Sequence, residues 1–438
     1  MSFSVFKDVL PSGLTVVTIE APHLHSVMCA VYVRIGSRHE DERTNGVSHL
    51  LEHLFFRGSH RYPDSVRMNA AVEAVGGNLN GVTMRDSSYF YSPVHVSGVE
   101  TTLSVLGEML TRPRFRHLET EKKIILEEML DEVDEKGRDI DVDNLSKRLL
   151  YPDHPLSLKI AGTPDSVKAL SLKDVRAHFG RAYVGGNLVV SVAGPVRRKR
   201  VLEATKVAFK HLPPGEPLNE SPPTPIAATG PRFKYVTLEE AQVEFRVSFP
   251  TVREDHPDAA GLGLLRRVLD DGLSSRLPHN IVEKRGLAYS VGAMIEAFHD
   301  AGTFEIDGAS APENFAKVLE EVFKTLATLR RGKIAPEELR RAKTRFAMHL
   351  DFLQDSPADL CGWFGGVELY RPAETFEEKK AEVERVTLAD LKRLAKTWLV
   401  PDRLVVVGVG PKSAKKKAER VVGRAESLLR SGPLTARG

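Results

Sequence analysis

The chain has 438 residues, of which 42% are hydrophobic and 28% are charged, a composition typical of a folded globular protein with more than one domain. Its formal net charge is only +3, and Lys and Arg are mixed with Asp and Glu, which argues against nucleic acid or an anionic membrane as the main partner. Two cysteines far apart in sequence exclude both a disulfide framework and a cysteine-rich zinc site.

The N-terminal residues lack the basic segment and apolar run of a signal peptide. No stretch approaches the ~18 consecutive apolar residues that a membrane-spanning helix needs. We therefore expect a cytoplasmic protein without a membrane anchor.

Strand and helix patterns alternate irregularly along the chain. A hairpin is predicted around Pro11-Ser12-Gly13, and further strands are predicted at 26–36, 87–94, 187–194, 302–309 and 403–410. Helical patterns cover 64–75, 98–111, 117–135, 141–150, 171–180, 312–330, 336–353 and 387–398. The strands outnumber those of a strict βαβ alternation, so we predict an α+β fold with mostly antiparallel sheets and helices on one face.

A proline-rich segment, residues 212–231, divides the chain into halves of similar length and is predicted to be a linker between domains 1–211 and 232–438. With an offset of 215 residues, the segment 30–54 aligns with 244–269, and both contain a strand, a charged loop, a glycine and a leucine-rich helix in the same order. This shared order predicts that the two halves are copies of one α+β unit.

The first half contains the motif H-x-x-E-H at His49, Glu52 and His53. Four residues make just over one helical turn, so the two imidazoles project from one face and can bind the same Zn²⁺. Glu52 would be close enough to take a proton from water at that metal. Two histidines at this spacing are more often surface or packed residues, but the intervening glutamate and the apolar helix favour a metal site.

A catalytic zinc site needs a third protein ligand. The helical pattern at 117–135 contains Glu121 and Glu128, which are two turns apart and share one face. Glu128 is our candidate for the third zinc ligand, and Glu121 is the candidate carboxylate that supports it. Glu127 is an alternative third ligand, on the basis of its position alone.

These motifs resemble those of the pitrilysin/insulinase (inverzincin) family of zinc metallopeptidases, and especially its smaller processing-peptidase-like members. The matching segments are 46–63, 73–91, 121–134, 183–194 and 284–297, and 74 residues separate His53 from Glu128, as the family motif requires. The resemblance implies that His49, His53 and Glu128 bind one zinc per chain, that Glu52 is the general base, and that Glu121 orients a ligand.

The resemblance also implies two duplicated halves that close like a clam around an unfolded peptide. The peptide would be held as an added strand beside residues 78–84, with Asn80 next to its backbone, and Tyr289 of the second half would hydrogen-bond the scissile carbonyl.

The second half departs from the family pattern. Val282 stands where active members with a single site carry an arginine, and Arg285 is out of phase with that position. The positions that match His49, Glu52 and His53 are Leu264, Arg267 and Val268, which cannot hold a metal.

We therefore predict a zinc-dependent endopeptidase or oligopeptidase that hydrolyses peptides or unfolded segments. Because smaller family members commonly act as dimers, we expect a homodimer, or a heterodimer with a related chain that supplies the Arg–Tyr pair. The alternative is a non-catalytic structural subunit of the same fold; the complete ligand set favours the enzyme.

Overall fold

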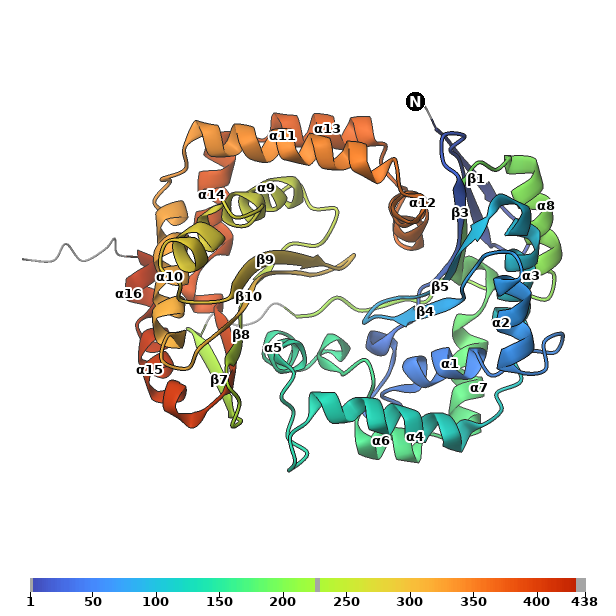
Figure 1. Ribbon diagram of the computed structural model, residues 1–438, viewed down its shortest axis with the longest axis horizontal. Coiled ribbons are helices and arrows are strands. Elements are labelled where there is room, and N and C mark those ends of the chain that lie inside the picture. The colour runs from blue at the N-terminus through green and yellow to red at the C-terminus, as the bar shows by residue number, and fades with distance from the viewer. Residues whose placement is uncertain (1–2, 225–228, 431–438) are drawn as a thin grey trace, which may run out of the picture. The chain divides into compact units, whose positions relative to one another are not determined.

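The computed structural model describes residues 3–224 and 229–430, which form two compact units (Figure 1). Unit 1 comprises residues 1–130, 158–221 and 349–375, and unit 2 comprises residues 131–157, 222–348 and 376–438. The break between Ser221 and Pro222 falls inside the proline-rich segment. Each unit also contains one segment from the other half of the sequence. Residues 131–157, from the first half, belong to unit 2, and residues 349–375, from the second half, belong to unit 1, which differs from the predicted boundaries.

Unit 1 is built on a six-stranded sheet in the order β1-β2-β6-β3-β5-β4, in which only the β2–β6 pair is parallel. Apolar, largely β-branched residues make β3 and β6 the buried central strands, as expected for strands covered on both faces. The strands are β1 (Ser4–Val9), β2 (Thr15–Glu20), β3 (Ser26–Val33), β4 (Asn80–Thr83), β5 (Ser88–His95) and β6 (Leu188–Gly194).

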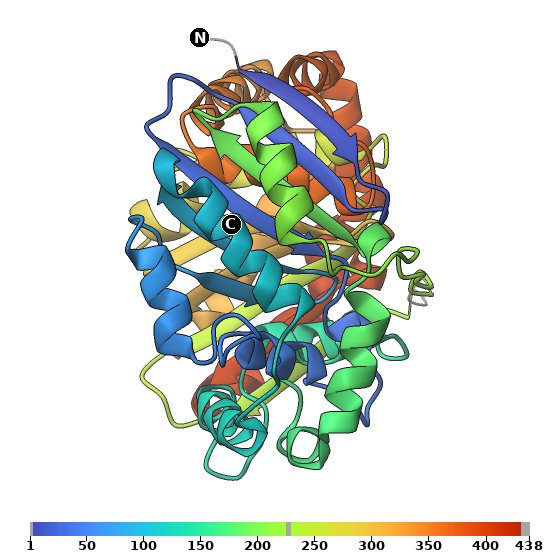
Figure 2. The same ribbon diagram turned by 90° about the vertical axis from the view of Figure 1, so that its right-hand side faces the viewer.

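Helices cover both faces of the unit 1 sheet. Figure 2 shows α3 and α8 side by side across one face, where their apolar sides join the core. The opposite face receives α12, which contacts β3 and β6. The helices of this unit are α1 (Val47–Phe55), α2 (Ser65–Glu73), α3 (Val99–Thr111), α4 (Leu118–Glu128), α6 (Pro164–Ala169), α7 (Leu172–Ala182), α8 (Arg198–Ala208) and α12 (Pro357–Cys361), with the short helices η1 (Ser37–His39), η2 (Val96–Gly98), η5 (Gly185–Asn187), η7 (Gly362–Gly366) and η8 (Val367–Leu369).

Unit 2 is built on a five-stranded sheet in the order β7-β11-β8-β10-β9, in which only the β7–β11 pair is parallel. The strands are β7 (Arg232–Thr237), β8 (Val243–Thr251), β9 (Ser290–Ala297), β10 (Gly302–Ser310) and β11 (Val405–Gly410). The helices are α5 (Val142–Leu150), α9 (Ala259–Leu269), α10 (Phe315–Arg330), α13 (Phe376–Arg385), α14 (Leu388–Trp398), α15 (Lys412–Gly423) and α16 (Ala425–Arg430), with η4 (Pro155–Ser157), η6 (Pro278–Glu283) and η9 (Pro401–Arg403). Helix α11 (Pro336–Leu353) runs from unit 2 into unit 1, and η3 (Met129–Glu132) runs from unit 1 into unit 2.

The two sheets share one topology. Without the extra edge strand β1, the order β2-β6-β3-β5-β4 corresponds strand by strand to β7-β11-β8-β10-β9, including the single parallel pair. The predicted α+β class, with mostly antiparallel sheets in two duplicated halves, is confirmed.

Two details of the predicted elements are wrong. The helix predicted at 117–135 ends at Glu128 and continues as η3, where the chain passes from unit 1 to unit 2. Strands β4, β7 and β9 were not predicted as strands; the sequence of β9, SVGAMIEA, is rich in small residues rather than β-branched ones. No helix among the described residues is long and apolar enough to cross a membrane.

Candidate metal centre

Helix α1 presents the two histidines of the motif on one face. Val47, Leu50, Leu51 and Leu54 are fully buried in the unit 1 core, so the opposite side of the helix carries His49, Glu52 and His53. The two imidazole rings are 4.7 Å apart between centroids and nearly perpendicular. The helix begins after Gly46, whose φ of 93° favours glycine, and a Cβ there would lie 2.6 Å from the carbonyl oxygen of Ala161.

Helix α4 packs against α1 and brings Glu128 to the two imidazoles. The Oε2 atom of Glu128 lies 3.9 Å from Nε2 of His49 and 3.6 Å from Nε2 of His53. In residues 3–224 and 229–430, these three side chains are the one group of His, Cys, Asp and Glu close enough to share an ion, with ligand atoms all within 4.8 Å of one another. Glu127 does not belong to the group.

The arrangement fits a zinc ion. Two donors bound to a tetrahedral ion at ~2.0–2.2 Å are about 3.3–3.6 Å apart. The two distances from Glu128 to the imidazoles, 3.9 and 3.6 Å, differ from that range by a few tenths of an ångström at most, and the three ligand atoms all lie within 4.8 Å of one another, so shifts of up to about 1 Å would bring the groups into place. The donor set of two imidazoles and one carboxylate is that of a catalytic zinc site with an open position. Burial, together with the neighbouring His53, lowers the pKa of His49 to about 4, so this imidazole is neutral and able to bind a metal near pH 7.

Glu121 orients one of the histidines. Its carboxylate is 2% exposed, and Oε2 lies 3.2 Å from Nδ1 of His53, while Oε1 accepts a hydrogen bond from Nε of Arg57. A proton held on Nδ1 leaves the lone pair of Nε2 facing Glu128, and hydrogen-bonded carboxylates commonly orient metal-binding histidines in this way. The structure therefore places the Glu121 carboxylate beside Nδ1 of His53, on the side of the ring away from Glu128.

Glu52 contacts the edge of the sheet. The hydroxyl of Thr83, on β4, donates a hydrogen bond of 2.6 Å to Oε2 of Glu52. Burial raises the pKa of Glu52 above its ordinary value, although the bond from Thr83 works in the other direction. A raised pKa makes a carboxylate a stronger proton acceptor near neutral pH.

Strand β4 forms the edge of the unit 1 sheet, because no described strand pairs with its free side. Gly81 and Thr83 point toward Glu52, as the contacts of Gly81 with the Glu52 side chain indicate, and the alternation of a strand turns Asn80 to the other face. The Asn80 amide donates to the carbonyl of Asn78 instead. Asn80 thus lies on the edge strand, but its side chain points away from Glu52.

The other expected site residues belong to unit 2. Tyr289 precedes β9 and is 88% exposed. Val282 packs against the core of unit 2, and Arg285 forms an ion pair of 3.0 Å with Glu321.

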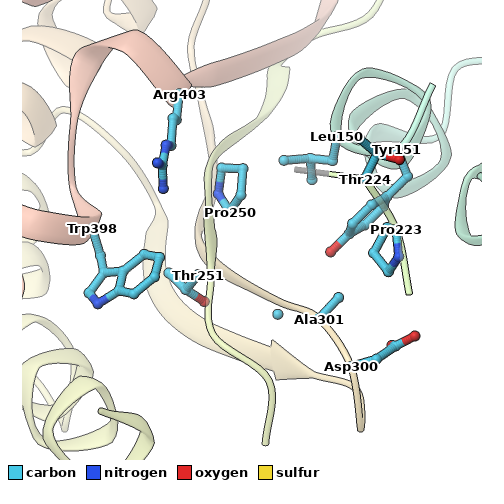
Figure 3. A pocket seen from close by; sticks show the side chains of 11 residues that line it. Leu150, Tyr151, Pro223, Thr224, Pro250, Thr251, Asp300, Ala301, Trp398 and Arg403 are labelled. Carbon is cyan, nitrogen blue, oxygen red and sulfur yellow. The ribbon is translucent and has the colours of Figure 1, made fainter. Parts of the chain in front are cut away.

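Among the described residues, the repeat of α1 in unit 2 and a cavity of that unit contain no second group of metal ligands. In α9, Leu264 and Val268 are buried, and Arg267 pairs with Asp271 at 3.0 Å. A cavity of 290 Å³ in unit 2 contains none of the predicted site residues (Figure 3). Its lining includes Tyr151, Trp398 and Arg403.

Sequence analysis missed three residues that contact the site or its helix, namely Thr83, Arg57 and Glu40. The available signal for Arg57 was its position four residues after His53, just beyond the end of α1. Thr83 contacts Glu52 from a strand 31 residues further along the chain, and the cap formed by Glu40 depends on the path of the loop before α1; neither has a sequence signature.

The chain was compared with known proteins. Residues 15–164 match a family model described as insulinase (peptidase family M16), and residues 169–346 match the model described as the peptidase M16 inactive domain. A protein of Mycobacterium leprae named as an uncharacterized zinc protease is 28% identical over 432 residues, 96% of this chain and 94% of that protein. Another of that description from Bacillus subtilis is 27% identical over 401 residues, 89% of this chain and 95% of that one.

Solved structures show the same fold. A protease from Helicobacter pylori matches with a TM-score of 0.84 at 21% identity, covering 93% of this chain and 100% of that one. A peptidase M16 inactive domain from Pseudomonas fluorescens also matches with a TM-score of 0.84, at 22% identity, covering 93% and 98%. Two models of one peptidase family account for most of residues 15–346, and relatives that match over nearly their whole length are named as zinc proteases. The chain belongs to the insulinase family of peptidases, M16.

Proposed function

We propose that this protein is a zinc-dependent endopeptidase or oligopeptidase that hydrolyses peptides or unfolded protein segments. The observation that carries the proposal is the convergence of His49, His53 and Glu128 beside Glu52, which itself contacts an edge strand. The zinc proteases among the relatives support the choice of metal.

The residues of the site would divide the work as follows. His49, His53 and Glu128 hold the ion, which polarises the scissile carbonyl and acidifies water when it is bound. Glu52 accepts a proton from the attacking water and passes it to the leaving amine. Thr83 donates to Oε2 of Glu52, which fixes the orientation of the carboxylate that accepts this proton.

A free sheet edge beside Glu52 favours an extended peptide as substrate. A peptide that pairs with β4 as an added strand gains main-chain hydrogen bonds, which are independent of its sequence. Such pairing requires an unfolded segment, and it uses the backbone of residues 80–83 rather than the side chain of Asn80.

The test combines metal analysis with peptide hydrolysis. Wild-type protein should contain about one zinc per chain, and Glu128→Gln should lose most of it whereas Glu127→Gln should not. Glu52→Gln should retain zinc and fold but hydrolyse an unstructured peptide at least roughly 100-fold more slowly, because an amide cannot accept the proton. Wild-type protein that holds zinc but cleaves no peptide, alone or with a related chain, would contradict the proposal and favour a structural subunit.

We further propose that the active form is a dimer, either of this chain or with a related chain that carries the Arg–Tyr pair. Two observations support it: Val282 packs into the core where an arginine would be needed, and Arg285 is held by Glu321. Sedimentation would give the oligomeric state. A monomer with full peptidase activity, unchanged by a partner chain or by Val282→Arg, would contradict this proposal.

A further inference from the structure

The first turn of α1 is capped by a side chain from the preceding loop. Glu40 is buried, and its Oε2 accepts hydrogen bonds from the backbone N–H of Gly46 (2.7 Å) and the side chain of Asn45 (2.9 Å). Its Oε1 accepts a third hydrogen bond from the backbone N–H of Ser48 (2.8 Å). One carboxylate therefore satisfies two of the N–H groups that open the helix.

The helix has no other side-chain cap at this end. Its N-cap residue is Gly46, which makes no side-chain hydrogen bond, and the first N–H groups of a helix have no partners within the helix. His49 is the third residue of α1 and belongs to this first turn. The position of its imidazole therefore depends on how firmly the turn is held.

Burial of the charged carboxylate of Glu40 costs free energy. Burial raises the pKa of Glu40 to about 7, even though its hydrogen bonds from Asn45, Gly46 and Ser48 all favour the charged form. Placing a negative charge at a helix N-terminus stabilises the helix, which offsets part of that cost.

Unit 2 provides an internal comparison. The residue that aligns with Glu40 is Asp255, whose carboxylate is 47% exposed and pairs with Arg253. In the corresponding helix, α9, the side chain of the N-cap residue Asp258 caps no N–H group, and the backbone N–H of Asp258 donates to Nδ1 of His256 at 3.0 Å rather than to a carboxylate. The buried carboxylate cap is thus present on the helix that bears the histidines and absent from its copy that lacks them.

We infer that Glu40 is a positioning residue for the metal centre, which holds the first turn of α1 so that His49 meets His53 and Glu128. This inference rests on the proposed zinc site. Glu40 does not touch the metal, and it acts through the backbone of Gly46 and Ser48.

The test measures metal binding in Glu40→Gln, which keeps the size of the side chain but offers one acceptor oxygen instead of two. The matched control is Asp64→Asn, because Asp64 also caps a helix of unit 1, α2, by accepting from the N–H of Arg67 at 2.9 Å. Zinc affinity is measured by competition with a chromogenic chelator, and the visible absorption of the cobalt-substituted proteins reports the coordination geometry. Near-ultraviolet circular dichroism of the metal-free proteins checks the fold.

Glu40→Gln should bind zinc roughly 10- to 100-fold more weakly than wild type, the usual effect of losing a group that supports a ligand, and its cobalt spectrum should change. Asp64→Asn should match wild type in both measurements. Equal zinc affinity and an unchanged cobalt spectrum in folded Glu40→Gln would overturn the inference while leaving the zinc site itself intact. If Glu40→Gln does not fold, Glu40→Asp is measured in the same way, and wild-type affinity in that variant overturns the inference. A wild-type protein that binds no zinc would overturn the proposed function as well.

Discussion

Individual hydrogen bonds to α1 orient the candidate site residues that this helix carries. Glu121 fixes His53, Thr83 fixes Glu52, and Glu40 holds the backbone before His49. Directly behind the first turn, the hydroxyl of Ser48 lies 2.8 Å from Nε2 of His178 on α7. A buried histidine that lies outside the candidate metal-binding group thus contacts the same turn of α1.

His178 should make the stability of the protein depend on pH. Burial lowers the pKa of His178 to about 3, whereas in the unfolded chain the same imidazole titrates near 6.5. Between these values the unfolded state binds a proton that the folded state does not, so stability falls as the pH drops below about 6.5. Between pH 7 and pH 5 the loss should be up to about 2 kcal/mol from this residue.

The measurement is the free energy of unfolding of metal-free wild type and His178→Gln at both pH values. Glutamine can still hydrogen-bond Ser48 but does not titrate, so the variant should lose less stability than wild type on acidification. A parallel decline in the two proteins would show that His178 is not the group responsible.

At the scale of elements, the site depends on how closely α1 approaches β4. Gly81 is the strand residue at the point of contact: a Cβ there would lie 2.9 Å from the ring of Phe56 and 3.0 Å from Cγ of Glu52. The absence of a side chain at this position therefore lets the edge strand lie against Glu52.

Replacing Gly81 by alanine should slow peptide hydrolysis without removing the metal. The added methyl group would push the Glu52 side chain away, and displacements of about 1 Å in an active site can cost on the order of 100-fold in rate. The control is Gly180→Ala on α7, where an added Cβ meets no atom within 4 Å. The control should keep full activity and gain roughly 0.5–1 kcal/mol of stability as a helical alanine. Equal kcat values for Gly81→Ala and wild type would exclude this steric role.

At the scale of the whole molecule, the two halves of the sequence exchange segments. After α4 the chain enters unit 2, where α5 packs on β8 and β11, and after α11 it enters unit 1, where α12 packs on β3 and β6. Each sheet is thus covered on one face by a segment from the other half of the sequence. On α5, the exchanged segment is anchored by Lys147, which is 0% exposed and donates to Glu305 at 2.6 Å.

Replacing Lys147 by methionine should strongly destabilise the protein. Glu305 is also buried, and loss of its ammonium partner leaves a buried carboxylate with less compensation, which typically costs about 3–5 kcal/mol. Chemical denaturation measures the change, with Lys324→Met as the control, because Lys324 forms comparable pairs on the exposed side of α10. The control should lose less than about 1 kcal/mol. Similar losses in the two variants would mean that Lys147 does not anchor α5.

Much of the fold could be predicted from local sequence patterns. The helices at 99–111, 315–330 and 336–353 have strong apolar periodicity, and the structure contains each of them within a few residues of the predicted bounds. Strand β9 escaped prediction because its small residues carry no strong strand preference, and pairing with β10 determines its conformation. The end of α4 at Glu128 also escaped, because the passage of the chain between units, and not a local signal, ends the helix.

The sequence by itself determined the metal-binding motif and the duplication. His49 and His53 share a helix face through the 3.6-residue period alone, and matching strand and helix order reveals a repeat without any coordinates. Only the tertiary structure decided that Glu128 rather than Glu127 meets the histidines, that Glu40 caps their helix, and that 131–157 and 349–375 change units. The physical reason is that periodicity acts over one or two turns of a single element, whereas these choices depend on contacts between different elements and on the path of the loop that precedes a helix.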